Sequence, residues 1–322
     1  MKKRLLAAAV AASMTLSLSV ALAAPVVEID GSAEVKYEWD RYEHADNDEG
    51  ALNTFILNAK TAVSDNVDFY TRLAVQRYHG FSGDDGYPDF NTKDGSRKST
   101  ATIDRFGFIL KDDNVTYNLG RQDADLGPNL LLYTTSGNIG SSATLFDGLT
   151  TSATLGATEL NLLAGQETDT ENKLYALHAA YNPTDAWVIG GTLARYDYDG
   201  VSAGGKDKTN HWGIDTAYTY GSTTYFAEYA KSNEDVENKA FLVGVTHELD
   251  DRNSIGLTYA KVEALGDING NTDFDAGLKG LYFSFDHKLS EKTTLNLSYK
   301  DLKEIGGSEK QRAIETTVTY AF

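Results

Sequence analysis

The residues with the clearest chemical potential lie between Asp267 and Asp275, where side-chain oxygens recur at alternate positions around a glycine. The run reads Asp267-Ile268-Asn269-Gly270-Asn271-Thr272-Asp273-Phe274-Asp275. Carboxylate and amide oxygens spaced in this way are typical of calcium loops. The run lacks the bidentate glutamate that closes a complete EF-hand loop. The simpler interpretation is an acidic external loop, so we predict no metal site here.

Histidines are the remaining candidates for acid–base or nucleophilic chemistry. The six are His44, His79, His178, His211, His247 and His287. They are scattered along the chain, and none lies in a recognisable nucleophile motif. The chain contains no cysteine, which excludes disulfides and thiolate-ligated metals. We therefore predict that the protein is not an enzyme and carries no cofactor.

The N-terminus has the three parts of a secretory signal. Lys2, Lys3 and Arg4 form a basic region, residues 5–22 are apolar or small, and Ala21-Leu22-Ala23 is an A-x-A cleavage site. These features predict a signal peptide over residues 1–23, which is cleaved, and a mature chain over residues 24–322 that leaves the cytoplasm.

The chain is strongly acidic. Its formal charge is −18, and loss of the three basic residues of the signal leaves the mature chain at −21. Binding to nucleic acid needs an excess of Lys and Arg against the phosphates, so we predict no nucleic-acid partner. A negative field instead favours the attraction of cations to a mouth or lumen.

Residues 27–40 alternate between apolar and polar types without a break. The apolar set is Val27, Ile29, Gly31, Ala33, Val35, Tyr37 and Trp39, and the polar set is Glu28, Asp30, Ser32, Glu34, Lys36, Glu38 and Asp40. A half-buried strand in a soluble protein keeps this pattern over about 4–8 residues. The longer run fits a tilted membrane strand, which needs at least about 9–11 residues.

The same alternation recurs along the whole mature chain and predicts sixteen strands. They are expected at 27–40, 51–64, 66–78, 100–112, 114–121, 148–157, 159–167, 173–182, 185–198, 209–220, 222–231, 238–249, 253–264, 278–289, 292–303 and 311–322. Short links of turn-forming residues alternate with the long links 79–99, 122–147, 199–208 and 265–277. An even strand number with alternating link lengths is typical of bacterial transmembrane barrels.

The mature chain offers no other way to cross a membrane. After residue 24 no apolar run approaches the roughly 18–20 residues of a spanning helix. The mean hydropathy of −0.38 is compatible with a barrel, because every second strand residue faces water. We therefore predict one all-β domain, an antiparallel transmembrane barrel.

The C-terminus ends on an aromatic residue. Val318, Tyr320 and Phe322 fall on one face of the last predicted strand. A strand that closes a membrane barrel needs one face in lipid and an aromatic at the interface. We interpret these three residues as a signal for assembly.

The chain resembles the general porins of Gram-negative outer membranes. The shared features are sixteen strands, a C-terminal Phe and a long third external link. Gly120-Arg121-Gln122 at the end of the fifth strand and the closing pair Asp147-Gly148 are similar to the family pattern. The resemblance implies a location in the cell outer membrane and a water-filled channel for passive diffusion of ions and small hydrophilic solutes. It also implies a homotrimer, contact with lipid and lipopolysaccharide, insertion by the barrel-assembly machinery, and a third link folded into the lumen.

In that family, acidic groups on the third link face basic groups on the wall at the pore constriction. By analogy the acidic side is Asp123, Asp125 and Asp147, and the wall offers Lys36, Arg72, Arg105 and Arg121. The chain departs from the family pattern because residues 126–146 carry no charge. The direction of Arg105 is ambiguous, because it shares a strand face with Ile103, while Asp104 lies among aromatics on the other face.

We predict moderate cation preference, because acids dominate the inner face of the first strand. A solute-selective porin is the first alternative, and it would show saturable conductance with one solute. The second is a barrel acting mainly as an adhesin or envelope structural protein, which would show no pore conductance.

Overall fold

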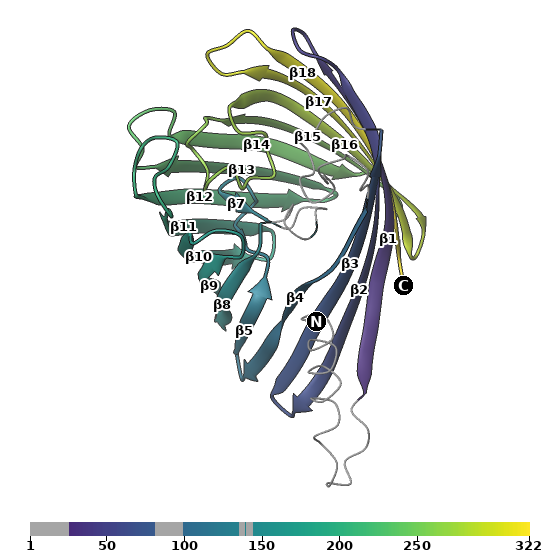
Figure 1. Cartoon of the computed structure of the whole chain (residues 1–322), viewed down its shortest axis with the longest axis vertical. Coiled ribbons are helices and arrows are strands. Elements are labelled where there is room, and N and C mark those ends of the chain that lie inside the picture. The colour runs from purple at the N-terminus through teal and green to yellow at the C-terminus, as the bar shows by residue number, and fades with distance from the viewer. Residues whose placement is uncertain (1–25, 81–98, 135–138, 140–143) are drawn as a thin grey trace, which may run out of the picture.

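A computed structural model describes residues 26–80, 99–134, 139 and 144–322 of the 322-residue chain. The predicted signal peptide and most of the 79–99 link fall outside the described residues. Within them, sixteen strands form one closed barrel and two short strands form a separate hairpin (Figure 1). No helix in this part of the chain is long and apolar enough to cross a membrane.

The barrel is an antiparallel meander, in which each strand pairs with its neighbours in sequence. Its strands are β1 (Val27–Tyr42), β2 (Asp48–Ser64), β3 (Val67–His79), β4 (Ser99–Asp112), β5 (Val115–Gln122), β8 (Phe146–Leu155), β9 (Thr158–Glu167), β10 (Lys173–Thr184), β11 (Trp187–Asp197), β12 (Lys208–Tyr220), β13 (Thr223–Ser232), β14 (Lys239–Glu248), β15 (Asn253–Val262), β16 (Leu278–Ser290), β17 (Thr293–Glu304) and β18 (Lys310–Ala321). The hairpin strands β6 (Asp125–Leu126) and β7 (Leu132–Tyr133) lie in the link between β5 and β8. The sixteen predicted strands are confirmed, and their ends differ from the prediction by at most three residues.

Closure joins the two ends of the chain. β1 pairs with β18 in a register that runs from Ser32 opposite Ala321 to Tyr42 opposite Gln311. A closed sheet leaves no strand edge, so every backbone N–H and C=O in the wall has a partner without water. This explains how a chain with many polar residues can form a membrane wall.

The outer face carries the large apolar side chains. On β11 and β12, Leu193 and Ile214 are 63% and 57% exposed, whereas the neighbouring Ala194 is 7% exposed and faces inward. A surface of exposed apolar residues around a polar interior is the reverse of a soluble protein and suits contact with lipid.

The short links gather at one end of the barrel, here called the turn end, and the remaining links lie at the opposite loop end. Gly156 and Gly221 begin two of the tight turns with φ values of 62° and 58°. The left-handed conformation costs glycine little, and such turns match the twist of paired strands. Asp113 adopts φ 45° at the equivalent place, which an aspartate tolerates better than most residues.

The C-terminal residue is held on the outer face. The backbone of Phe322 exchanges hydrogen bonds with that of Gly31, with N···O distances of 3.1 and 3.4 Å. Its ring stacks on Phe55 at a centroid distance of 5.9 Å, and a Cβ on Gly31 would lie 2.7 Å from the ring. Val318 and Tyr320 are also exposed. The three residues predicted as an assembly signal therefore lie on the outer wall.

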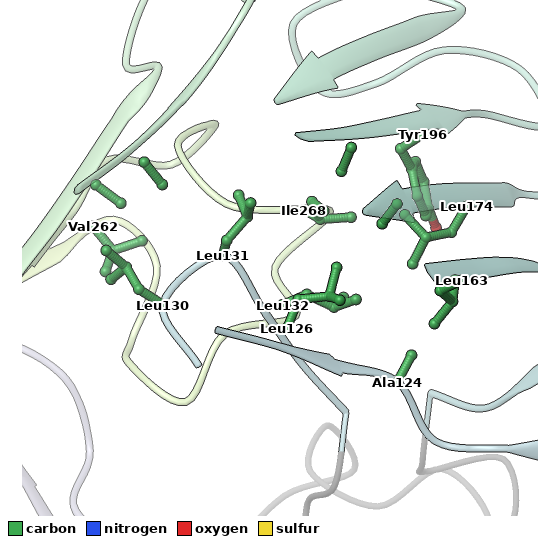
Figure 2. Close-up of a cluster of buried hydrophobic side chains, with 14 of the residues drawn as sticks. Ala124, Leu126, Leu130, Leu131, Leu132, Leu163, Leu174, Tyr196, Val262 and Ile268 are labelled. Atoms are coloured by element: carbon green, nitrogen blue, oxygen red, sulfur yellow. The ribbon is translucent and has the colours of Figure 1, made fainter. Parts of the chain in front are cut away.

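The buried apolar cluster lies inside the barrel and on one side of it. It combines inward residues of the wall from β8 to β15 with residues of the links that follow β5 and β15 (Figure 2). Its members on the wall are mostly small or aliphatic, including Leu163, Leu174, Ala230, Leu242 and Val262. This side of the barrel therefore has a packed core instead of an open lumen.

Candidate pore constriction

The described part of the β5–β8 link, residues 123–134, packs against the inner wall. Leu130, Leu131 and Leu132 are fully buried, and Ala124 and Leu126 are 3% exposed. The absence of charge from residue 126 onward explains the packing of the leucines, since an apolar face gains roughly 25 cal/mol for each Å² removed from water. This part of the link thus lies within the barrel (Figure 2).

A polar group on the wall fixes the bend of this link. The N–H of Leu130 donates to Oε2 of Glu228 on β13 at 3.2 Å. Gly127 adopts φ 61°, and a Cβ built on it would lie 3.6 Å from atoms of His178, Asp215 and Glu228. The left-handed glycine lets the backbone pass close to these three side chains. Glu228 anchors the link. None of the three was among the predicted site residues.

The β15–β16 link, residues 263–277, also turns inward and pairs with the β5–β8 link. The N–H of Ile268 donates to the carbonyl of Leu131 at 3.1 Å, and that of Tyr133 donates to the carbonyl of Asn271 at 2.9 Å. The segment that we interpreted as an acidic external loop is thus partly internal. The reason is that its backbone extends the small β6–β7 hairpin.

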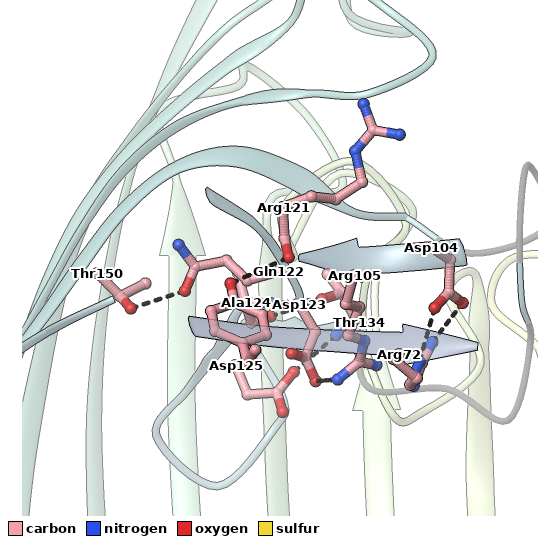
Figure 3. Close-up of polar contacts among 11 residues, drawn as sticks. Arg72, Asp104, Arg105, Arg121, Gln122, Asp123, Ala124, Asp125, Thr134 and Thr150 are labelled. Carbon is pink, nitrogen blue, oxygen red and sulfur yellow. Dashed lines mark hydrogen bonds and ion pairs between the residues drawn. The ribbon is translucent and has the colours of Figure 1, made fainter. Parts of the chain in front are cut away.

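The β6–β7 hairpin presents acids at its exposed edge. The N–H of Thr134 donates to Oδ1 of Asp125 at 2.9 Å, and the hydroxyl of Thr134 accepts from the N–H of Ala124 at 2.6 Å. These bonds hold Asp123 and Asp125 close to β3 and β4 (Figure 3). Predicted acidic residues and predicted basic residues therefore meet here.

A β-bulge on β4 resolves the ambiguity at Arg105. Arg72 pairs with Arg105 while the next residue of β3, Leu73, pairs with Ile103, so Asp104 is the extra residue. A bulge shifts the alternation by one position. Asp104 and Arg105 therefore both point inward, whereas Ile103 is exposed on the outer face.

The two inward arginines are both paired. Nε and Nη2 of Arg72 contact the two carboxylate oxygens of Asp104 at 2.7 and 2.5 Å, and both side chains are buried. Arg105 Nη1 lies 2.7 Å from Oδ2 of Asp123 on the β5–β8 link (Figure 3). Arg72 thus forms a neutral pair within the wall, whereas Arg105 bridges the wall and the link.

Arg121 and Asp147 lie elsewhere. They face each other across β5 and β8, with Nη2 of Arg121 2.8 Å from Oδ2 of Asp147. Their face of the strands is that of the exposed Leu119 and Leu149, and Arg121 also lies over the exposed ring of Phe106. The expectation that this pair lines the constriction is therefore corrected: both residues point outward, because the resemblance gave their sequence position but not their face.

Lys36 faces inward, in a charged network on β1, β17 and β18. Its Nζ lies 2.9 Å from Glu38 and 3.3 Å from Glu315. Lys300 lies 3.1 Å from the same Glu315 and 3.5 Å from Asp275 of the β15–β16 link. The network connects the wall opposite the apolar core to the inward link.

Asp273 completes the acidic side. Burial raises its pKa to about 6, and the field of Glu315, Asp125 and Asp275 acts in the same direction, while Lys300 opposes it. Tyr133 lies near Asp273 and Asp125, and burial raises its pKa to about 12. The two inward links thus bring the three carboxyl groups of Asp125, Asp273 and Asp275 into one region, near Glu315 and Lys300 of the wall.

Sequence reasoning missed Asp104, Asp273, Asp275, Lys300 and Glu315. Alternation alone could have placed two of them, because Lys300 and Glu315 lie on the opposite face from the exposed Tyr299 and Ile314. Their pairing could not be seen, since Lys36 and Glu315 lie at opposite ends of the chain and meet only on barrel closure.

Comparison with known proteins agrees with this architecture. The model of the Gram-negative porin family matches residues 6–306. The chain belongs to the Gram-negative porin family. It is a porin of the outer membrane, and it forms a channel through it. No curated protein sequence matches the chain.

Solved structures show the same fold at low sequence identity. A loop L8 deletion mutant of OmpT, an outer membrane protein of Vibrio cholerae, is 13% identical, with a TM-score of 0.61 over 93% of this chain and 100% of that one. A triple mutant of the Rhodopseudomonas blastica porin is 11% identical, with a TM-score of 0.59 over 92% of this chain and 100% of that one. At these identities the likeness concerns the fold.

Proposed function

We propose that this porin is a diffusion channel for ions and small hydrophilic solutes with moderate cation preference, narrowed by the two inward links. The observation that carries the proposal is the charge lining the candidate constriction. Four cationic side chains face eight anionic ones: Lys36, Arg72, Arg105 and Lys300 against Glu38, Asp40, Asp104, Asp123, Asp125, Asp273, Asp275 and Glu315.

The net negative charge remains because the cationic side chains are already paired with acids. Arg72 is neutralised by Asp104 within the wall, and Lys36 and Lys300 share Glu315. A charged ring in a narrow, water-filled passage favours counter-ions in proportion to its net field. Each cation has an acidic partner, so the remaining acids make the net charge of the constriction negative. The paired cations reduce this charge and keep the cation preference moderate.

The test is the zero-current potential of the reconstituted protein in a planar bilayer across a KCl gradient. We expect the sign that reports K⁺ permeating faster than Cl⁻. Replacing Asp273→Asn together with Glu315→Gln should reduce this preference, whereas Asp147→Asn, on the outer wall, should leave it unchanged. Anion preference in the wild-type protein would contradict the proposal.

Two alternatives remain distinguishable in the same experiment. A solute-selective porin would show conductance that saturates or is blocked by one class of solute, and an adhesin or envelope protein would show no conductance steps. The family and the fold point to a channel in place of an enzyme, and we propose no catalytic role for the histidines.

We further propose the partners that the family resemblance implies. The porin would assemble as a homotrimer, contact lipopolysaccharide, and be inserted by the barrel-assembly machinery after cleavage of residues 1–23. Sequencing of the mature N-terminus should begin at Ala24, and chemical cross-linking of whole cells should give a trimer band.

A further inference from the structure

A row of four lysines crosses the wall of the barrel near the loop end. In the register of β15 with β16, Lys261 lies opposite Lys279. On the next two strands, Lys303 lies opposite both Lys279 and Lys310. The four strands are neighbours in the barrel (Figure 1), and neighbouring strands lie about 4.8 Å apart. The four residues, here called the lysine row, therefore follow one line around the wall.

The lysine row lies on the outer face. Side chains alternate between the two faces of a strand. Lys279 shares its face of β16 with Leu281, which is 48% exposed, and Lys303 shares its face of β17 with Tyr299, which is 38% exposed. The row is thus separate from the charged groups assigned above to the candidate constriction.

The two central lysines of the row have no acidic partner. At its ends, Lys261 lies 2.6 Å from Glu263, and Lys310 lies 2.9 Å from Glu43. Neither Lys279 nor Lys303 forms an ion pair with a carboxylate in the part of the chain that the structure describes. Like charges directly opposite each other destabilise a sheet. The row therefore lacks a counter-charge within this chain.

Two further pairs of like charge lie at the same height of the outer wall. Lys231 lies opposite Lys239 on β13 and β14. Arg41 lies opposite Arg312 where β1 meets β18, although Asp301 approaches Arg312 at 3.6 Å. Every strand from β13 through β18 to β1 thus carries an outward cation near the loop end, in a chain that is acidic as a whole.

A cavity gives one end of the row a place for a small polar group. It has a volume of about 320 Å³ and is lined by Arg41, Tyr42, Glu43, Lys310 and Arg312. Three of these five residues are cationic and one is acidic. An anionic group of the size of a phosphate would fit this cavity and meet charges of the opposite sign.

The turn end of the same strands is different. Its outward positions on β15–β18 hold no lysine or arginine, and residues such as Phe285, Leu289, Leu295 and Tyr320 occupy them. Transmembrane barrels have short turns on the periplasmic side and longer loops outside. The lysine row therefore lies at the height of the outer leaflet headgroups, and the lipid there is its natural occupant.

We propose that the lysine row and the Arg41–Arg312 pair bind phosphate groups of the outer-leaflet lipid by direct ion pairs. The inference rests on the lipopolysaccharide contact proposed above and names the residues that make it. Long basic side chains can keep their stems against apolar surface while their charged ends reach the headgroups. Phosphates between the strands would also relieve the repulsion within the row. No divalent cation is needed to bridge protein and lipid.

The test is binding of a lipid A with two phosphate groups to the refolded porin in mixed micelles of neutral detergent with EDTA. Native mass spectrometry gives the mole fraction of lipid that half-saturates the protein. The wild type should bind in EDTA, and dephosphorylated lipid A should bind at least about tenfold more weakly. Lys279→Gln with Lys303→Gln should weaken binding of the phosphorylated lipid to a similar extent.

Two control variants separate the position of the charge from its amount. Lys279→Arg with Lys303→Arg keeps both charges and should bind like the wild type. Lys60→Gln with Lys111→Gln removes the same charge near the turn end, where these lysines pair with Glu28 and Asp68, and should also bind normally.

Urea unfolding without lipid gives a second readout. The Lys279→Gln, Lys303→Gln variant should be at least as stable as the wild type in neutral detergent, because the repulsion between the strands is reduced. Lower stability would mean that these lysines support the wall by themselves, and this would overturn the proposal.

Four other results would also overturn the proposal. Loss of wild-type binding in EDTA would indicate bridging by divalent cations. Equally effective binding of inorganic phosphate would indicate a site for free anions, and a changed oligomeric state of the glutamine variant would indicate a second copy of the chain on the row. Unchanged lipid binding by this variant would remove the lysine row but leave the lipopolysaccharide contact, whereas no binding by the wild type under any condition would remove both.

Discussion

At the scale of single residues, the candidate site is governed by which charges are paired and how deeply they are buried. Arg72 and Asp104 lie within one wall and cancel each other, while Arg105 and Asp123 connect the wall to the β5–β8 link. Removing one member of a buried pair leaves the other charge without compensation. Substitution in such a pair should therefore cost much more folding stability than substitution in an exposed pair.

Arg72→Met should destabilise the folded barrel by about 3–5 kcal/mol, because Asp104 is then buried alone. The double variant Arg72→Met with Asp104→Leu should recover most of this loss. Arg195, in an exposed pair with Asp197, provides the control, and Arg195→Met should have no measurable effect. Urea unfolding of the refolded protein measures all three. Equal stability of wild type and Arg72→Met would show that the pair does not support the wall.

Asp273 should make the channel depend on pH. Its pKa is raised by burial to about 6, above the ordinary value of 3.8, so it carries its charge only above that range. Cation preference should therefore rise between pH 5 and pH 7. Asp273→Asn should flatten this rise. Zero-current potentials at several pH values measure this dependence. An unchanged slope in the variant would exclude Asp273 as the group that causes it.

The same shift has a consequence for stability. A carboxyl whose pKa is higher in the folded state than in the unfolded state binds its proton more readily when folded. Its contribution is therefore fully present below pH 3.8 and is lost as the pH rises through about 6. Asp273→Asn should stabilise the barrel near neutral pH and have no effect in acid.

At the scale of elements, the β5–β8 and β15–β16 links fill part of the barrel interior. The β5–β8 link contributes fully buried leucines, and the β15–β16 link pairs with its backbone. A bare barrel of sixteen strands would leave a wide aqueous channel. The size limit for solutes should therefore depend on these links.

Deleting residues 126–146 should raise the single-channel conductance and the solute size limit, because the deletion removes the packed leucines from the lumen. Removing Ala45 and Asp46 from the short β1–β2 link is the control and should leave both unchanged. Planar-bilayer recording and liposome swelling measure the two quantities. If the shortened protein assembles and conducts like the intact one, the link does not limit the pore.

At the scale of the whole molecule, closure depends on contacts between the two ends of the chain. The backbone of Phe322 bonds to that of Gly31, and its ring stacks on Phe55 of β2. Since Phe322 lies on the outer wall, it can affect assembly without touching the lumen.

Deleting Phe322 should reduce the amount of protein inserted in the outer membrane and leave the conductance of surviving channels unchanged. Quantification in outer-membrane fractions, with single-channel recording of the purified remainder, measures both effects. Phe322→Tyr keeps an aromatic ring and is the control, with expected insertion close to wild type. Normal insertion of the deletion variant would remove Phe322 from the assembly signal.

The sequence alone determined the strands and their faces, because period-two alternation is a local property that survives in any register. Residues 27–40 could be assigned an apolar and a polar side without knowledge of their partners, and this placed Lys36 on the polar side. Strand number and link lengths then required a closed barrel, since only closure satisfies the backbone in lipid.

Tertiary structure alone decided which charges meet. The bulge at Asp104 turned Arg105 inward, and such a bulge depends on pairing with β3 and leaves no local pattern. Arg121 and Asp147 were assigned to the pore by resemblance, but alternation along β5 and β8 places them on the outward face with Leu119 and Leu149. Contacts such as Lys36 with Glu315 join residues that are distant in sequence, so they exist only after the barrel closes and its links fold inward.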